Sequence, residues 1–197
     1  MFGVVITEGH IITNGTTQIW PERSVQEQRT AYYAYEQDTI DAAEFWKRIG
    51  SPLPPRESER QLFDRFALDA DFEKLAETVR GRLDMVVISN MPKDWKPSVL
   101  EFGIGPHLKR FFTSGEERMW KPNDDFFLHV CTESGVTPQE CVFVDDQRRN
   151  LEAASKLGMV PVWAKREGQA NFASDYYPEY SVKDLGELCS LLPRLFG

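Results

Sequence analysis

The chain has 197 residues, of which 41% are apolar and 27% charged, so it is typical of globular proteins and unlike collagen or disordered chains. Its formal net charge of -8 disfavours non-specific nucleic-acid binding, which depends on Lys and Arg side chains that neutralise phosphates. No apolar run approaches the roughly 18–20 residues that span a bilayer, and the first residues show no basic, cleavable leader. We therefore expect a cytoplasmic protein that contacts neither membranes nor nucleic acid.

Cysteines and histidines give no sign of a structural metal or a disulfide framework. The three cysteines, Cys131, Cys141 and Cys189, are far apart and form no CxxC motif, and the three histidines do not have zinc-ligand spacing. Reduced, mostly buried thiols are the expected state.

The first apolar run, residues 3–6, predicts a short buried strand. From about residue 14 to residue 81 the pattern is helical, and we expect helices over residues 24–35, 41–49, 56–66 and 71–80. A crossover between parallel strands needs only a dozen or so residues, so this stretch predicts an inserted helical module. Its aromatic residues are expected mainly to form the core of that module, with a substrate pocket as the alternative. They are Trp20, Tyr32, Tyr33, Tyr35, Phe45 and Trp46.

After residue 81, short apolar runs alternate with amphipathic segments, which is typical of a parallel α/β sheet. Strands are expected over residues 84–89, 110–113, 141–145 and 159–164, and helices over residues 94–102, 122–134 and 148–157. Gly135 and Gly158 follow the last two helices, where left-handed caps are common. Together with the first run, this predicts a five-stranded parallel sheet covered on both faces.

Polar residues follow three of the expected strands, at the edge where parallel sheets bind ligands. Ser89 and Asn90 end VVISN, Lys121 lies in SGEERMWKP, and Asp145 with Asp146 ends VFVDD. Taken singly, each could be a helix cap or a solvated turn. Their occurrence in this order at strand ends indicates a functional site.

These three segments resemble the second, third and fourth motifs of the haloacid dehalogenase-like (HAD) superfamily, in the branch with a helical cap after the first strand. The resemblance implies a Rossmann-like, doubly wound α/β core over residues 1–14 and 82–197, with the cap over residues 15–81. It also implies that Ser89, Asn90 and Lys121 bind a phosphoryl group and that Asp145 and Asp146 help to hold Mg²⁺.

The first motif departs from the family pattern, in which the first strand ends in Asp-x-Asp. Aligning residues 4–6 with that strand places Thr7 at the nucleophile and Gly9 at the acid/base position. A neutral hydroxyl and a bare backbone supply neither function, and one magnesium ligand is lost as well. We therefore expect weakened Mg²⁺ binding and a catalytically degenerate member, a pseudoenzyme that binds a phosphate, another anion or a phosphorylated metabolite, or that regulates a protein partner.

An active enzyme is the alternative. A one-residue shift in register places Glu8 at the nucleophile position and His10 at the acid/base position, which would allow a phosphatase or a dehalogenase acting on a small metabolite. A Thr7–His10 pair is a further alternative, while His10 as a local cap is the plainer interpretation. The sequence names neither a ligand nor a pathway, and it leaves self-association open.

Overall fold

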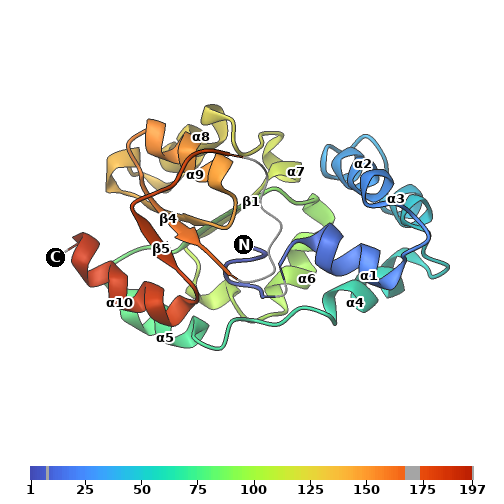
Figure 1. Ribbon diagram of the computed structural model, residues 1–197, viewed down its shortest axis with the longest axis horizontal. Coiled ribbons are helices and arrows are strands. Elements are labelled where there is room, and N and C mark those ends of the chain that lie inside the picture. The colour runs from blue at the N-terminus through green and yellow to red at the C-terminus, as the bar shows by residue number, and fades with distance from the viewer. Residues whose placement is uncertain (8, 167–173, 197) are drawn as a thin grey trace.

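The computed structural model describes residues 1–7, 9–166 and 174–196. Strands and helices alternate over its second half, as the sequence predicts (Figure 1). The described strands are β1 (Val86–Ser89), β2 (Arg110–Thr113), β3 (Val142–Asp145), β4 (Val160–Ala164) and β5 (Tyr180–Val182). The longer helices of this half are α8 (Asp124–Ser134), α9 (Arg148–Lys156) and α10 (Leu185–Phe196). The shorter ones are α6 (Lys96–Leu100), α7 (Ser114–Glu117) and single 3₁₀ turns at Lys93–Trp95, Gly105–His107 and Pro138–Glu140.

The first half of the chain is helical, as expected. It contains a π-helical turn (Ile11–Thr16), α1 (Thr17–Ile19), α2 (Val25–Glu36), α3 (Ala42–Ile49), α4 (Pro55–Phe63) and α5 (Phe72–Val79). The Asp41 side chain accepts a hydrogen bond from the Glu44 amide at 2.8 Å and so caps α3, as the sequence predicts. Helices α1 to α4 gather on one side of the molecule, whereas α5 lies beside α10 (Figure 1). The expected boundaries of the inserted module, residues 15–81, stay a prediction.

A cluster of aromatic rings joins the helical module to the rest of the molecule. Trp95, in the segment after β1, lies 5.6–6.1 Å from the ring centroids of five aromatic residues of the module. These are Tyr32, Tyr35, Phe45, Trp46 and Phe63. The expectation that the aromatics form a core is therefore confirmed for most of them, and Trp95 is a member that the sequence did not reveal.

The described strands form two separate parallel sheets, β1–β2 and β3–β4–β5. The strand expected over residues 3–6 is not formed, and that prediction is wrong. The Met1 carbonyl accepts hydrogen bonds from the amides of Val4, Val5 and Ile6, so these residues fold into a tight turn. An apolar run predicts burial, and Val4 and Ile6 are indeed buried in this turn.

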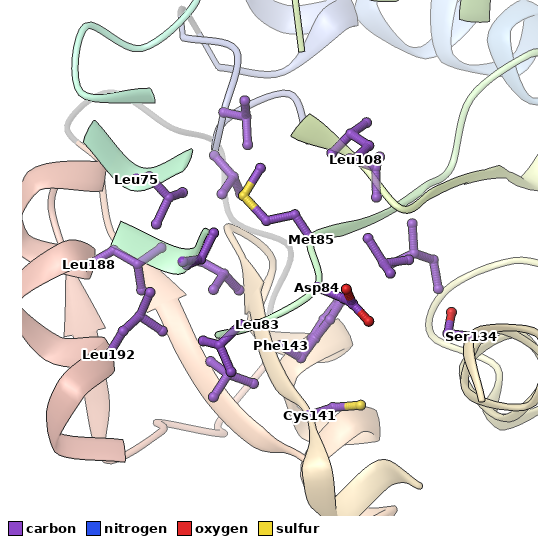
Figure 2. Close-up of a pocket in the computed structure, with 18 of the residues that line it drawn as sticks. Leu75, Leu83, Asp84, Met85, Leu108, Ser134, Cys141, Phe143, Leu188 and Leu192 are labelled. Carbon is purple, nitrogen blue, oxygen red and sulfur yellow. The ribbon is translucent and has the colours of Figure 1, made fainter. Parts of the chain in front are cut away.

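Between β1 and β3 lies a cavity of about 440 Å³, lined mainly by apolar side chains (Figure 2). Protein interiors contain few voids larger than a water molecule. The split of the sheet therefore leaves an unusually large, mainly apolar space between β1 and β3.

Gly115 in α7 marks a close approach between two backbone segments. A Cβ atom there would lie 2.6 Å from the Lys93 backbone nitrogen, and backbone cannot move aside as a side-chain end can. We expect Gly115→Ala to lower the free energy of unfolding by about 1–3 kcal/mol in a chemical denaturation curve. Gly105→Ala is the control, because its Cβ would meet only the end of the Leu100 side chain. Equal stability of the two variants would contradict this packing.

Candidate functional site

The polar residues that the sequence singles out do come together. Ser89 and Asn90 at the end of β1, Lys121 before α8, and Asp145 and Asp146 at the end of β3 line one small cavity of about 90 Å³. All except Asn90 are buried. They meet because β1 and β3 end at the same edge, where open parallel sheets bind ligands.

A buried ion pair lies at the centre of this cavity. The Lys121 ammonium donates to Asp145 Oδ2 at 2.6 Å, and both side chains are under a tenth exposed. The other carboxylate oxygen of Asp145 accepts from the Gln147 amide at 2.8 Å and from Asn150 Nδ2 at 2.9 Å. Burial would raise the pKa of Asp145, but the charges of Lys121 and the Met1 amine outweigh it and lower that pKa. Asp145 therefore stays ionised at neutral pH.

Asp146 differs from its neighbour. Burial, followed by repulsion from Asp145, raises the pKa of Asp146 to about 6. Gln147 Nε2 donates to one of its oxygens at 2.6 Å. Two adjacent carboxylates in a buried site repel each other, and a bound cation would relieve that repulsion.

Asn90 uses both ends of its side-chain amide to hold the backbone of Lys121 in place. Its Oδ1 accepts from the Lys121 amide and its Nδ2 donates to the Lys121 carbonyl, each at 2.9 Å. The Tyr32 hydroxyl of α2 donates to the Asn90 carbonyl at 2.9 Å. One asparagine thus connects the helical module to the lysine of the site.

Thr7 and Gly9, which the sequence alignment assigns to the first motif, do not join this cluster. The Thr7 amide and hydroxyl both donate to the Ala67 carbonyl, at 2.8 and 3.0 Å, and Thr7 does not line the cavity. Gly9 has a positive φ of 81°, and a Cβ there would lie 2.9 Å from the Asn14 side chain. Glu8 lies outside the described residues.

Met1, rather than Thr7, lines the cavity beside the ion pair. Its side chain is buried and lines the cavity, and its amino group interacts with the charges of Lys121, Asp145 and Asp146. Burial, and next the charge of Lys121, lowers the pKa of this amine to about 6. Met1 therefore lies beside the ion pair, whereas the assignment of Thr7 and Gly9 to the first motif stays a prediction.

His10 lines the cavity and also caps a helix. Its Nδ1 accepts from the Ile12 amide at 3.2 Å at the start of the π-helical turn, as the plainer interpretation predicts. Burial, followed by the charges of Arg29 and Arg149, lowers the pKa of His10 to about 4. The imidazole is therefore neutral at pH 7, and it is too weak an acid in this form to protonate a leaving group.

Sequence reasoning missed several residues of this cavity. Glu36 reaches it from α2 and accepts a hydrogen bond from the Ser114 hydroxyl, and burial raises the pKa of Glu36 to about 7. Gln147, Arg149 and Asn150 come from the start of α9. The motif DDQRRN places these last three next to the aspartates, which was a usable signal, whereas nothing local distinguishes Glu36 from an ordinary surface glutamate.

The family model of the haloacid dehalogenase-like hydrolases matches residues 5–158, and the chain therefore belongs to this family. Among curated proteins, it is similar to the N-acylneuraminate-9-phosphatases of mouse, with 32% identity over 128 residues, and rat, with 24% over 131. These matches cover 64% and 65% of this chain, and 52% and 53% of the relatives. The chain thus spans about half the length of these relatives.

Solved structures share the fold. A HAD phosphatase from Thermococcus onnurineus has a TM-score of 0.69 at 22% identity, covering 97% of this chain and 95% of the other. The L-2-haloacid dehalogenase from Xanthobacter autotrophicus has a TM-score of 0.70 at 17% identity, covering 98% of this chain and 96% of the other. A HAD family enzyme from Bacteroides thetaiotaomicron, in complex with magnesium and inorganic phosphate, has a TM-score of 0.68 at 21% identity, covering 83% and 90%.

Asp145 and Asp146 fit the Mg²⁺ that this family uses. Proteins bind Mg²⁺ through one or two carboxylates while water and phosphate oxygens complete the octahedral shell, and the repulsion between these two aspartates favours a cation. The part of the chain that the structure describes contains no group of three or more His, Cys, Asp or Glu residues suited to a metal. When bound, the ion would neutralise charge on phosphate oxygens.

No helix among the described residues is long and apolar enough to cross a membrane.

Proposed function

We propose that this chain is a member of the HAD-like hydrolases that binds a small phosphorylated molecule without turning it over, because Thr7 and Gly9 stand where the family's first motif carries its two aspartates. The observation that carries this proposal is the buried Lys121 ammonium beside Ser89, with the carboxylates of Asp145 and Asp146 facing it. This combination suits a phosphate group accompanied by a divalent cation. The names of the curated relatives, which are phosphatases of small metabolites, support a phosphorylated ligand.

Charge balance explains why the cation and the anion should bind together. Asp145 already neutralises Lys121, so a phosphate dianion alone finds little net positive charge at this point. Mg²⁺ at Asp145 and Asp146 would add two positive charges and free the Lys121 ammonium for the phosphate. Without phosphate, two carboxylates hold the ion weakly, as the sequence predicts.

Titration calorimetry with inorganic phosphate at pH 7.5 tests this. We expect Mg²⁺ to tighten phosphate binding, and Lys121→Met to weaken it by about 10- to 100-fold, because a charge-assisted hydrogen bond contributes roughly 1.5–3 kcal/mol. Lys156→Met, which removes a lysine from the exposed face of α9, is the matched control and should bind like the parent chain. Circular dichroism checks that Lys121→Met is folded, because this change leaves Asp145 buried without its partner. Equal affinities in the two variants would argue against the proposed site.

An active hydrolase is the second candidate, favoured by Glu36. A carboxyl group with a pKa near 7 that lines the site suits general acid/base catalysis at neutral pH. Glu8 remains a candidate nucleophile of this alternative, and the substrate would be a small phosphorylated or halogenated metabolite. Magnesium-dependent turnover that is lost on Glu36→Gln while phosphate binding persists would establish it.

We also propose a role for the helical module and a cellular location for the protein. Tyr32, Tyr33 and Glu36 of α2 line the cavity, so we assign the module the role of choosing the ligand. The free thiols of Cys131, Cys141 and Cys189 support a reducing compartment such as the cytoplasm.

A further inference from the structure

Within the described ranges, β1 and β3 face each other across the large cavity without pairing. Among the described residues, β1 pairs only with β2 and β3 pairs only with β4. Both strands line the 440 Å³ cavity. The lining residues are Val86, Val87 and Ile88 of β1, and Val142, Phe143 and Val144 of β3. An unpaired strand edge is a template for another strand.

The two edges run in the same direction across the cavity. Asp84 and Cys141, which precede β1 and β3, both line this cavity (Figure 2). Ser89 and Asp145, the last residues of the same strands, line the smaller polar cavity. A strand lying between them can therefore be parallel to both and pair with both.

Apolar layers cover the cavity on its two faces. Phe127 and Val130 of α8 line one face, and Leu75 of α5 with Leu188 and Leu192 of α10 line the other. Alternate residues of β3 follow this division, since Phe143 packs with the α8 cluster and Val144 with the α10 cluster. An occupant must therefore be apolar on both faces, as in strands of buried parallel sheets.

Met1 marks where such a strand would end. Met1 lines both the large apolar cavity and the polar cavity, so it lies where the two cavities meet.

We propose that the cavity between β1 and β3 is the seat of one further β-strand, an extended apolar segment of about five residues that is linked to the Met1 nitrogen and runs parallel to both edges. This strand joins the two sheets into one, in the order β2, β1, the added strand, β3, β4 and β5. The proposal is independent of whether the polar cavity binds phosphate.

The test compares two versions of the full chain, each with six residues added before Met1. One extension consists of Val and Ile residues and ends in Thr. The control extension has the same length but carries Pro at its second and fourth positions, because proline lacks the backbone N–H that a strand needs to pair with its neighbours. Amide hydrogen exchange by NMR is followed at β1 and β3. We expect exchange at their inner-edge amides to be at least ~100-fold slower in the strand-forming version, with a higher midpoint of unfolding. Cross-strand contacts from the extension to both β1 and β3 complete the expected result.

Each other outcome overturns the proposal. Equal exchange rates in the two versions mean that the extension does not enter the cavity. Inner-edge protection already present in the chain without an extension, at all protein concentrations, means that residues 2–6 fill the cavity themselves. Protection that grows with protein concentration in the unextended chain means that a second copy pairs with the edges. None of these results depends on phosphate binding, which the calorimetry measures separately.

Discussion

An N-terminal extension that fills the cavity and ends in Asp directly before Met1 is expected to confer magnesium-dependent phosphatase activity. The same extension ending in Asn should be at least ~10³-fold slower, because loss of a nucleophile usually costs several orders of magnitude. The physical reason is position: the Met1 amine already interacts with Lys121, Asp145 and Asp146, so a carboxylate attached at this point faces the residues that would hold a phosphate. Release of inorganic phosphate from a panel of phosphate esters is the measurement.

The control for this experiment is Thr7→Asp combined with Gly9→Asp, which restores the family's carboxylates in the register that the sequence alignment suggests. We expect this variant to be inactive, because Thr7 faces the Ala67 carbonyl and a side chain at residue 9 collides with Asn14. Turnover in this double variant, or equal turnover with Asp and Asn in the extension, would show that residue 7 and not the Met1 position belongs to the site.

Glu36→Gln is expected to stabilise the protein at alkaline pH and to leave it unchanged under acid conditions. Burial raises the folded-state pKa of Glu36 from its ordinary value of 4.5 to about 7, so the folded state binds its proton more tightly than the unfolded state does. The cost of ionising Glu36 is absent below pH 4.5, grows as pH rises, and is complete above pH 7. A shift of this size corresponds to about 3 kcal/mol.

Urea denaturation of the parent chain and of Glu36→Gln at pH 5, 6, 7 and 8 measures this dependence. Glutamine keeps an oxygen that accepts from Ser114, so packing at this point is preserved. Glu133→Gln, at an exposed position of α8, is the control and should give the same small difference at every pH. A constant difference between the parent chain and Glu36→Gln would mean that Glu36 is ionised throughout this range.

The sequence predicts the strands of the second half and the polar residues at their ends, because buried parallel strands appear as short apolar runs and ligands bind at their carboxyl ends. Four expected strands correspond to β1 to β4 with shifts of at most two residues. Strand β5 was missed, since its sequence YSV contains no apolar run. The fold class and the family are confirmed by the structure and by the family match.

The first strand could not be predicted correctly from local pattern. Val4, Val5 and Ile6 satisfy the apolar requirement of a strand, but the hydrogen bonds to the Met1 carbonyl decide in favour of a turn. Periodicity does not indicate which of two buried conformations the backbone adopts. Glu36 was missed for a different reason: its burial arises from contact with Ser114, which is 78 positions away in the chain.

Trp95 sets a limit on how ligands reach the polar cavity. Because five rings of the helical module pack around this one tryptophan, swinging the module away as a hinged lid would expose a large apolar surface to water. The Tyr32 to Asn90 hydrogen bond would be lost in the same movement, and Asn90 would lose part of its support for Lys121. We therefore expect ligands to enter and leave through small side-chain movements at the cavity mouth, which favours compact ligands. The size of the ligands that bind would then be limited by access to the cavity rather than by affinity.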